Sequence, residues 1–406
     1  MFELVGKYGN AKIFIDNVEQ SVLSQVFSIL NHPISKDAHV RIMPDCHVGV
    51  GCVIGFTAKL TDIVIPNLIG VDIGCGVLAC NLGKFNVDDI FFEYLDKKIK
   101  ELIPSGCNVR CINNKLNVSI SEDFLKDVQK VCKLTGQDYD YVYNSLGTLG
   151  GGNHFIELNR SKKTGDIWLT IHSGSRNFGL KIAKHFQNLA YKRRGYFGVE
   201  IENLKKKYEG KELGEKIKQI KKYNISKELF FLKGDDVRDY YYCMSVAQEY
   251  AKLNRNIMAQ IIIWNIIETV KYSNINQVVE SIHNYIDFGD GIIRKGAIKA
   301  HKGQKVVIPF NMAYGIVIGK GKGNPDWNYS APHGAGRVLA RGRAKETLSM
   351  NEYKEKMNAV WSSCVNEKTL DESPMAYKSP KEVIRYLKET VDIIEYCPTI
   401  YNYKGE

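Results

Sequence analysis

A carboxylate and a thiol stand three residues apart in a glycine-rich stretch of this chain, GVDIGCG at residues 70–76. Glycines permit close backbone approach and left-handed dihedral angles. A lone cysteine such as Cys75 is usually an inert member of a core. Asp72, however, needs a partner of its own if it is buried. A metal ion would satisfy both side chains, so Asp72 and Cys75 are candidate metal ligands.

Three further segments each present one histidine among small or amide residues: GGGNH at 150–154, IHSGSR at 171–176 and SIHN at 281–284. Taken singly, His154, His172 and His283 are each better explained by a structural role. Together with Asp72 and Cys75 they form a nitrogen, oxygen and sulfur donor set typical of a catalytic metal centre, in which two ions could share the thiolate. Ligand chemistry alone favours zinc, with manganese, iron and cobalt left open.

Two more histidine segments could carry chemistry. MPDCHVGVG at 43–51 places Asp45 and His47 two residues apart in an expected Pro-Asp turn, where Asp45 could equally cap the turn. SAPHGAGR at 330–337 follows His333 with small residues that a bulky group can approach, and Arg337 could neutralise phosphate charge. Histidine serves as a nucleophile, a base or a ligand, and the spacing does not choose among these roles.

The composition is that of a globular protein, with 44% hydrophobic and 25% charged residues in 406. We see neither an apolar run long enough for a membrane span nor a secretory signal, so we expect a cytoplasmic protein. Ten cysteines form no disulfide framework. The net charge of +11 comes partly from a lysine-rich stretch at 205–222. That charge fits a solvated helix face and a polyanion such as RNA about equally.

The elements that must position these side chains alternate along the chain. Apolar periodicity and β-branched runs predict the following segments: helices at 17–31, 91–103, 124–134, much of 181–275 (the lysine-rich part) and about 380–394, and strands at 168–171, 306–308 and 316–318. Between residues 40 and 80 we expect short strands joined by glycine-rich loops. Because no repeat or linker divides the chain, we expect one α+β domain over 1–406, with mixed β-sheets flanked by helices.

These motifs, in this order, resemble the RtcB family of RNA ligases. LGTLGGGNHFIE at 146–157 and the tail YKG at 403–405 match as well, so the resemblance covers essentially the whole chain. It implies a single RtcB-like domain and an enzyme of tRNA splicing or RNA repair that depends on GTP and Mn²⁺. Such a ligase joins RNA 3′-phosphate or 2′,3′-cyclic phosphate ends to 5′-hydroxyl ends, through a histidine–GMP intermediate and an activated RNA-3′-pp-5′-G end.

The resemblance also implies roles for single residues. His333 matches the guanylylated histidine and Asp45 an active-site acid. The two-manganese shell matches Asp72, Cys75, His154, His172 and His283, with Cys75 as the bridging thiolate. The guanylate-binding positions match Asn153, His154, Phe155, Ile156, Glu157, His283, Asn284, Pro309, Asn311, Met312, His333, Gly334, Ala335, Gly336 and Lys404. Among these, Glu157 and Lys404 would recognise guanine, whereas Arg176 and Arg337 would hold RNA phosphates.

Some alternatives stay open. The family usually reads Pro-Gly-Ser-Met where this chain has PFNM at 309–312, so the strictness of GTP use is not fixed. For activity we expect manganese, with zinc as an inhibitor, since availability and geometry can override affinity. The competing functions are a metal-dependent phosphohydrolase or phosphodiesterase that uses the same centre without guanylylation, and a catalytically silent RNA-binding protein. The expected partners are RNA and an activating protein such as archease.

Overall fold

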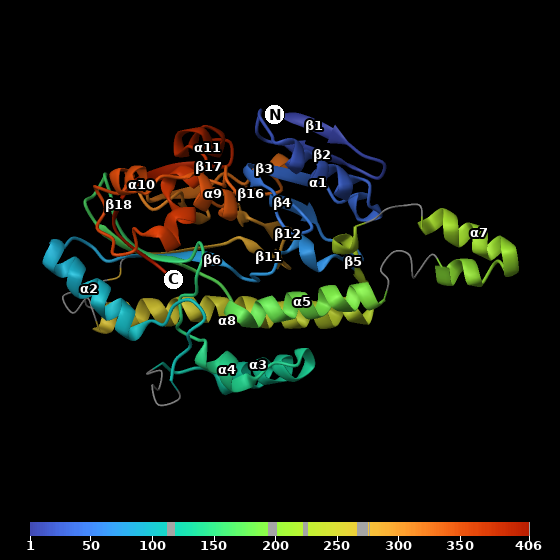
Figure 1. The fold of residues 1–406 in the computed structure, drawn as a ribbon, viewed down its shortest axis with the longest axis horizontal. Helices are drawn as coiled ribbons and strands as arrows, with labels where there is room; N and C mark the ends of the chain where they lie inside the picture. The colour runs from blue at the N-terminus through green and yellow to red at the C-terminus, as the bar shows by residue number, and fades with distance from the viewer. Residues whose placement is uncertain (112–117, 194–200, 222–225, 266–274, 276, 406) are drawn as a thin grey trace.

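The computed structural model describes residues 1–111, 118–193, 201–221, 226–265, 275 and 277–405. Several β-sheets fill its upper part, and long helices from the middle of the chain run beneath them (Figure 1). Mixed sheets flanked by helices confirm the predicted α+β class. Among the helices in these ranges, none combines the length and apolarity needed to cross a bilayer. None of the ten cysteines, all of which lie in these ranges, forms a disulfide bond.

The first sheet has six strands, β1 (Phe2–Val5), β2 (Asn10–Ile13), β3 (Val40–His47), β4 (Ile54–Lys59), β12 (Ile292–Lys295) and β11 (Asn284–Asp287), in that spatial order. Helix α1 (Gln20–Leu30) confirms the first predicted helix and buries its apolar face in the core. The expected Pro-Asp turn is wrong, because Pro44 and Asp45 lie inside β3. The β3–β4 register is irregular between Ile42 and His47, which accommodates a proline without a backbone donor.

The second sheet has five antiparallel strands, β10 (Gln277–Ile282), β6 (Gly76–Asn81), β8 (Ile167–Ser173), β7 (Phe155–Arg160) and β18 (Thr399–Lys404), in that spatial order. Strand β8 confirms the strand predicted to end near His172. Antiparallel neighbours place the first residue of one strand beside the last residue of the next. The beginnings of β6 and β7 therefore share one end of the sheet with the ends of β8 and β10.

A third sheet, β14 (Lys305–Pro309), β15 (Ile316–Gly321) and β17 (Val391–Cys397), confirms the two strands predicted there and packs on the second sheet through a buried cluster that includes Trp168, Val279 and Val307. The prediction of a last helix reaching residue 394 is wrong beyond α11 (Pro380–Leu387). Residues 391–397 pair with β15 instead, as suits a β-branched run that finds an open strand edge. Two small pairs complete the sheets: β13 (Ala297–Lys299) with β16 (Ser330–Pro332), and β5 (Ile63–Val64) with β9 (Leu232–Lys233).

The remaining helices are α2 (Asp89–Leu102), α3 (Glu122–Thr135), α4 (Tyr139–Asn144), α5 (Arg176–Lys192), α7 (Gly210–Lys221), α8 (Asp235–Asn265), α9 (Arg341–Thr347) and α10 (Met350–Lys356). α2 and α3 confirm the helices predicted at 91–103 and 124–134. α5 and α8 run side by side beneath the sheets, and α7 stands apart from the main body (Figure 1). Met258 and Ile262 of α8 share a buried cluster with Leu169 and Ile171 of β8. The predicted lysine-rich helical segment at 181–275 is largely helical where described, and its parts at 194–200, 222–225 and 266–274 lie outside the described residues.

Candidate active site

One end of the five-stranded sheet collects the candidate metal ligands. Cys75 directly precedes β6 and His154 directly precedes β7, whereas His172 lies near the end of β8 and His283 directly follows β10. A backbone hydrogen bond of 2.9 Å from the His283 N–H to the Cys75 carbonyl joins two of these segments. Strand order and antiparallel pairing therefore bring together residues that are distant in the sequence, such as Cys75 and His283.

The donor atoms form two overlapping groups: Cys75, His172 and His283 in one, and Asp72, Cys75 and His154 in the other. Within each group all ligand atoms lie within 4.8 Å of one another. The Cys75 Sγ is 3.2 Å from the His172 Nε2 and 3.5 Å from the His154 Nε2, and the latter nitrogen is 3.0 Å from the Asp72 Oδ2. Cys75 belongs to both groups. Each group offers the mixed donors that suit a divalent transition metal.

Backbone contacts orient two of the imidazoles. The His154 Nδ1 is 2.9 Å from the Leu149 carbonyl oxygen, and the His172 Nδ1 is 3.1 Å from the Asn153 carbonyl oxygen. A carbonyl oxygen only accepts, so each Nδ1 carries the proton and each Nε2 presents a lone pair to its group. Gly174 is needed beside them, because a Cβ there would collide with the Asp72 carboxylate.

The protonation states suit metal binding. Burial lowers the pKa of His172 and of His283 well below the usual value, so both rings are neutral, which is the ligating form. Burial also raises the pKa of the Cys75 thiol well above its usual value, and the nearby Asp72 carboxylate adds to this effect. A bound cation reverses the penalty on a buried thiolate.

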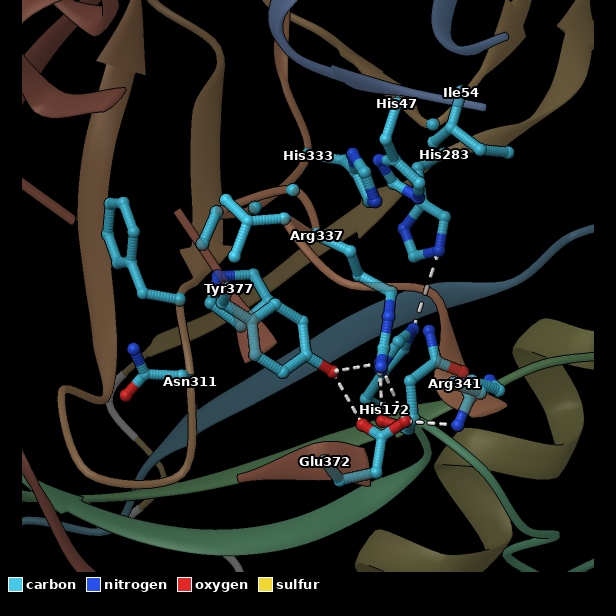
Figure 2. A pocket seen from close by; sticks show the side chains of 18 of the residues that line it. His47, Ile54, His172, His283, Asn311, His333, Arg337, Arg341, Glu372 and Tyr377 are labelled. Atoms are coloured by element: carbon cyan, nitrogen blue, oxygen red, sulfur yellow. Dashed lines mark hydrogen bonds and ion pairs between the residues drawn. The ribbon is translucent and has the colours of Figure 1, made fainter. Parts of the chain in front are cut away.

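His333 lies beside this group, in the loop after β16. Its Nδ1 is 2.6 Å from the Asp45 Oδ2, which also accepts the backbone N–H groups of His333 at 3.0 Å and Gly334 at 3.2 Å. Gly336 has φ +72°, and a Cβ there would meet the Asp45 carbonyl, so the loop packs directly on β3. The His333 ring lies 4.9 Å from the His283 ring, centroid to centroid, and Figure 2 shows the two side by side.

A single cavity of about 800 Å³ connects these features. Its wall contains most of the residues that the sequence predicted for metal and guanylate binding: Asp72, Cys75, Asn153, Phe155, Glu157, His172, His283, Asn284, Pro309, Asn311, Met312, His333, Gly334, Ala335, Gly336, Arg337 and Lys404. His154 and Asp45 lie behind this wall, where they contact Asp72 and His333. The divergent 309–312 segment therefore lines the same cavity as the conventional motifs.

Two predicted residues have their side chains elsewhere. In β7, alternation points Phe155 and Glu157 into the cavity, so Ile156 points the other way into a hydrophobic core. Only the backbone of Ile156 could then contact guanylate, and that contact stays a prediction. Arg176 does not line the cavity: its guanidinium donates to the Gly106 carbonyl at 2.7 Å and to the Thr148 Oγ1 at 3.1 Å. A contact between Arg176 and RNA phosphate stays a prediction.

Glu157 lines the cavity, and amide donors hold its carboxylate in place. The Asn402 Nδ2 is 2.7 Å from its Oε1 and the Asn159 Nδ2 is 3.0 Å from its Oε2. Burial is the main cause that raises the pKa of Glu157 to about 7, against the opposing effect of these hydrogen bonds. The carboxyl therefore changes its charge near neutral pH.

The cavity residues missed from the sequence include three that contact one another: Arg341, Glu372 and Tyr377. Glu372 ends the 3₁₀ helix η6 (Glu367–Glu372), and Tyr377 follows the 3₁₀ helix η7 (Pro374–Ala376). The Tyr377 hydroxyl donates to the Glu372 Oε2 at 2.5 Å (Figure 2). A short 3₁₀ segment has no periodic pattern of apolar residues from which a buried carboxylate could be predicted. The recurrence of arginines four residues apart, Arg337 and Arg341, was the one available signal.

The chain was compared with known proteins. The family model described as tRNA-splicing ligase RtcB matches residues 25–405. The RNA-splicing ligase RtcB of Escherichia coli K12 is 30% identical to this chain over 393 residues, which cover 90% of each protein. Two archaeal proteins named tRNA-splicing ligase RtcB are similar as well. The one from Archaeoglobus fulgidus is 27% identical, covering 90% of this chain and 87% of its own. The one from Nanoarchaeum equitans is 27% identical, covering 86% and 84%.

The match begins within α1, before β3, and ends just after β18, so it includes all the residues that line the cavity except Glu19. The resemblance inferred from the motifs is thereby confirmed. This chain belongs to the RtcB family of tRNA-splicing ligases.

Proposed function

We propose that this chain is an RNA ligase that joins a 3′-phosphate or 2′,3′-cyclic phosphate end to a 5′-hydroxyl end, with GTP as the activating nucleotide and two Mn²⁺ ions at the donor groups. Its family supports the RNA ligase activity. One observation carries the chemistry: a histidine paired with a buried carboxylate faces, in the same cavity, two donor groups that share a thiol.

The Asp45–His333 pair suits nucleophilic attack by the histidine. A carboxylate oxygen accepts hydrogen bonds, so the His333 Nδ1 carries the proton and the Nε2 keeps its lone pair. That nitrogen would attack the α-phosphorus of GTP, forming an N–P bond as the bond to pyrophosphate breaks. Asp45 would stabilise the positive charge that develops on the ring. It also fixes the ring, since it binds the backbone of the same loop.

The later steps release His333 again. An oxygen of the RNA 3′-phosphate would attack the phosphorus of the histidine–GMP adduct and take over the guanylate. The 5′-hydroxyl oxygen would then attack the RNA phosphate, lose its proton and expel GMP. A 2′,3′-cyclic phosphate must first be opened by water. Basic residues near the site, Arg337 and Arg176 among them, are proposed to hold the RNA by its phosphates, largely without reading sequence.

The residues that would hold the ions are Asp72, Cys75 and His154 for one and Cys75, His172 and His283 for the other. When bound, divalent cations neutralise phosphate charge and lower the pKa of a coordinated water. On the nucleotide, Glu157 and Lys404 are proposed to contact the guanine base. Phe155 offers the base an apolar face, and Asn153 and Asn284 offer amide groups on the cavity wall. An archease-type activating protein is the proposed protein partner.

The direct test is transfer of label from α-³²P-GTP to the protein in the presence of Mn²⁺. We expect wild-type chain to retain acid-labile label after denaturation, and His333→Ala to retain none. A 3′-phosphate RNA then added should discharge the label, and a 5′-hydroxyl RNA should convert the product to a joined strand.

Two controls separate the competing functions. Removal of the RNA phosphate without any protein labelling would favour the phosphohydrolase. RNA binding that survives a chelator, with no change at either RNA end, would favour the silent binding protein. Replacing Mn²⁺ by Zn²⁺ should stop label transfer. Replacing GTP by ATP tests whether the 309–312 segment has relaxed nucleotide choice.

A further inference from the structure

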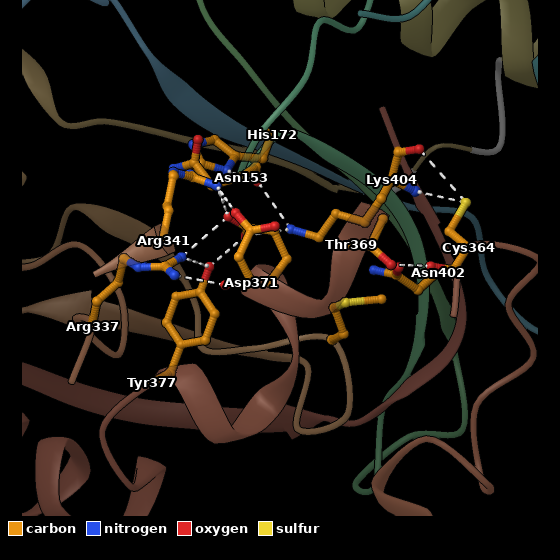
Figure 3. Close-up of polar contacts among 12 residues, drawn as sticks. Asn153, His172, Arg337, Arg341, Cys364, Thr369, Asp371, Tyr377, Asn402 and Lys404 are labelled. Carbon is orange, nitrogen blue, oxygen red and sulfur yellow. Dashed lines mark hydrogen bonds and ion pairs between the residues drawn. The ribbon is translucent and has the colours of Figure 1, made fainter. Parts of the chain in front are cut away.

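Glu372 is a buried carboxylate in a cation-rich wall of the cavity, and the proposed mechanism gives it no role. Its Oε2 lies 3.0 Å from the Lys404 Nζ and accepts the Tyr377 hydroxyl at 2.5 Å. Its Oε1 lies 3.1 Å from the Arg337 Nη1 and also contacts the Arg341 Nη1. Figure 3 shows the partners Arg337, Arg341, Tyr377 and Lys404 converging from different segments. Glu372 is thus the common partner of three cations.

The contact with Lys404 is the most deeply buried of these. The Lys404 side chain is 4% exposed and that of Glu372 is 3% exposed. An ammonium group taken out of water is stable only when an anion and hydrogen bonds compensate it. The other described polar contact of the Lys404 Nζ is a longer one of 3.4 Å to the Asn153 carbonyl, and this Nζ lies 5.5 Å from the centre of the Phe155 ring. Glu372 is therefore the charged group that fixes where the Lys404 ammonium lies.

Glu372 does not change its charge under ordinary conditions. Burial opposes its ionisation, but the charges of Lys404 and Arg341 outweigh burial and lower the pKa of Glu372 to about 2. The carboxylate is ionised wherever the enzyme is folded and active. Its contribution is consequently one of geometry and fixed charge, since no proton transfer involves it near neutral pH.

The preceding residue provides a natural comparison. Asp371 contacts the outer cations: its Oδ2 is 2.8 Å from the Arg341 Nη1 and its Oδ1 is 3.5 Å from the Lys345 Nζ. Among the described contacts, Asp371 has none with Lys404. The two adjacent acids share Arg341, but of the two only Glu372 lines the cavity and contacts Lys404.

We propose that Glu372 is a positioning residue for nucleotide binding, which holds the Lys404 ammonium on the cavity wall where the guanine base of GTP binds. This inference rests on the proposed function, because that function places GTP in the cavity. Glu372 acts through Lys404, so its effect on GTP affinity should exist only while Lys404 is present. The same carboxylate also contacts the Arg337 Nη1.

A double-mutant cycle on the full-length chain tests this coupling, with Kd for GTP measured by calorimetric titration. Lys404→Met and Glu372→Gln should each weaken GTP binding about tenfold, and the double variant should be no weaker than Lys404→Met alone. In the matched control cycle, the fold-change in Kd of the Asp371→Asn, Lys404→Met double variant should equal the product of the two single fold-changes. Melting curves verify that each variant is folded.

Three results would overturn the proposal. The first is that Glu372→Gln binds GTP as tightly as wild type or more tightly. The second is that the fold-changes in Kd of Glu372→Gln and Lys404→Met multiply in the double variant, and the third is that Asp371→Asn is coupled to Lys404→Met as strongly as Glu372→Gln is. If Glu372→Gln does not fold, Glu372→Asp keeps the charge but shortens its reach, and it too must weaken GTP binding. Unchanged affinity in that variant also overturns the proposal. A wild-type chain that neither binds GTP nor accepts label contradicts the proposed function itself, which is a different failure.

Discussion

The two sides of the cavity handle charge in opposite ways. At the proposed metal side, imidazoles, a thiol and a carboxylate gather, and no described cationic side chain is bonded to their donor atoms. At the side where we propose that the nucleotide binds, Arg337, Arg341 and Lys404 all contact the Glu372 carboxylate, which compensates their charge before any ligand arrives. The metal side needs a bound cation to compensate its donor atoms. The side chains of the proposed nucleotide side are already held in place, so a nucleotide would bind there without having to order them first.

The comparison predicts different consequences for mutations on each side. Variants at the reacting histidine should abolish the chemistry while leaving the metal side intact. Variants at the nucleotide side should change affinity in smaller steps, because several groups share the contact. The predictions below follow in order of expected size.

The largest effect should come from His333→Gln. Glutamine preserves much of the volume but removes the ring nitrogen that would accept GMP, so label transfer and ligation should fall below detection. Mn²⁺ binding, followed by electron paramagnetic resonance, should stay at the wild-type level because none of the five proposed ligands is altered. Residual protein labelling in this variant would show that another side chain is guanylylated.

Asp45→Asn should come next. The amide has nearly the shape of the carboxylate but no negative charge to stabilise the charged ring. We expect label transfer to slow by about 10²–10⁴-fold, the usual range for loss of such assistance. Single-turnover kinetics at saturating GTP check this, with Kd for GTP as the control. A rate within a factor of a few of wild type would remove Asp45 from the mechanism.

The pH dependence of GTP binding tests the nucleotide side. The pKa of Glu157 is raised to about 7, mainly by burial, and the ionised form is the one that accepts hydrogen bonds from guanine. GTP affinity should therefore rise as pH increases through 7 and level off above it, by about tenfold between one pH unit below that pKa and one unit above. Glu157→Gln should flatten the profile. A flat profile in wild type would contradict the assignment.

The same group has the opposite effect on stability. A folded-state pKa above the ordinary value of 4.5 means that the folded chain retains a proton which the unfolded chain has lost. Stability should therefore fall as pH rises from about 4.5 to about 7, and Glu157→Gln should remove this part of the change. Urea unfolding at a series of pH values measures it. A Glu157→Gln profile parallel to that of wild type throughout this interval would be inconsistent with the burial effect.

The smallest effect should be on stability in the presence of metal. Binding to the folded chain stabilises it by about 2.7 kcal/mol per site at a hundredfold excess of free ion over Kd. Mn²⁺ should raise the melting temperature of wild type and His333→Gln alike, and the rise should be smaller for Asp72→Ala, which disables only one donor group. Equal shifts in all three proteins would mean that Mn²⁺ binds elsewhere.

The sequence predicted the chemistry of the metal side well, because each ligand sits in its own glycine-rich or amide-rich segment. It could not predict which strands would be neighbours, and only the order β10-β6-β8-β7 shows why Cys75, His172 and His283 meet. The alternation of side chains along β7 turns the Ile156 side chain away from the cavity, which a linear motif does not reveal. Residues 391–394 failed as a helix because long-range pairing with β15 outweighed local periodicity. Glu372 escaped notice because its role depends on partners more than thirty positions away.

The central claim is that Asp72, Cys75, His154, His172 and His283 hold two ions through one shared thiolate. Counting bound Mn²⁺ by equilibrium dialysis and electron paramagnetic resonance in wild type and Cys75→Ala tests it most directly. The account predicts two spin-coupled ions per wild-type chain, and loss of both at the same free metal concentration in Cys75→Ala. A Cys75→Ala chain that still binds one or two ions with wild-type affinity would contradict it.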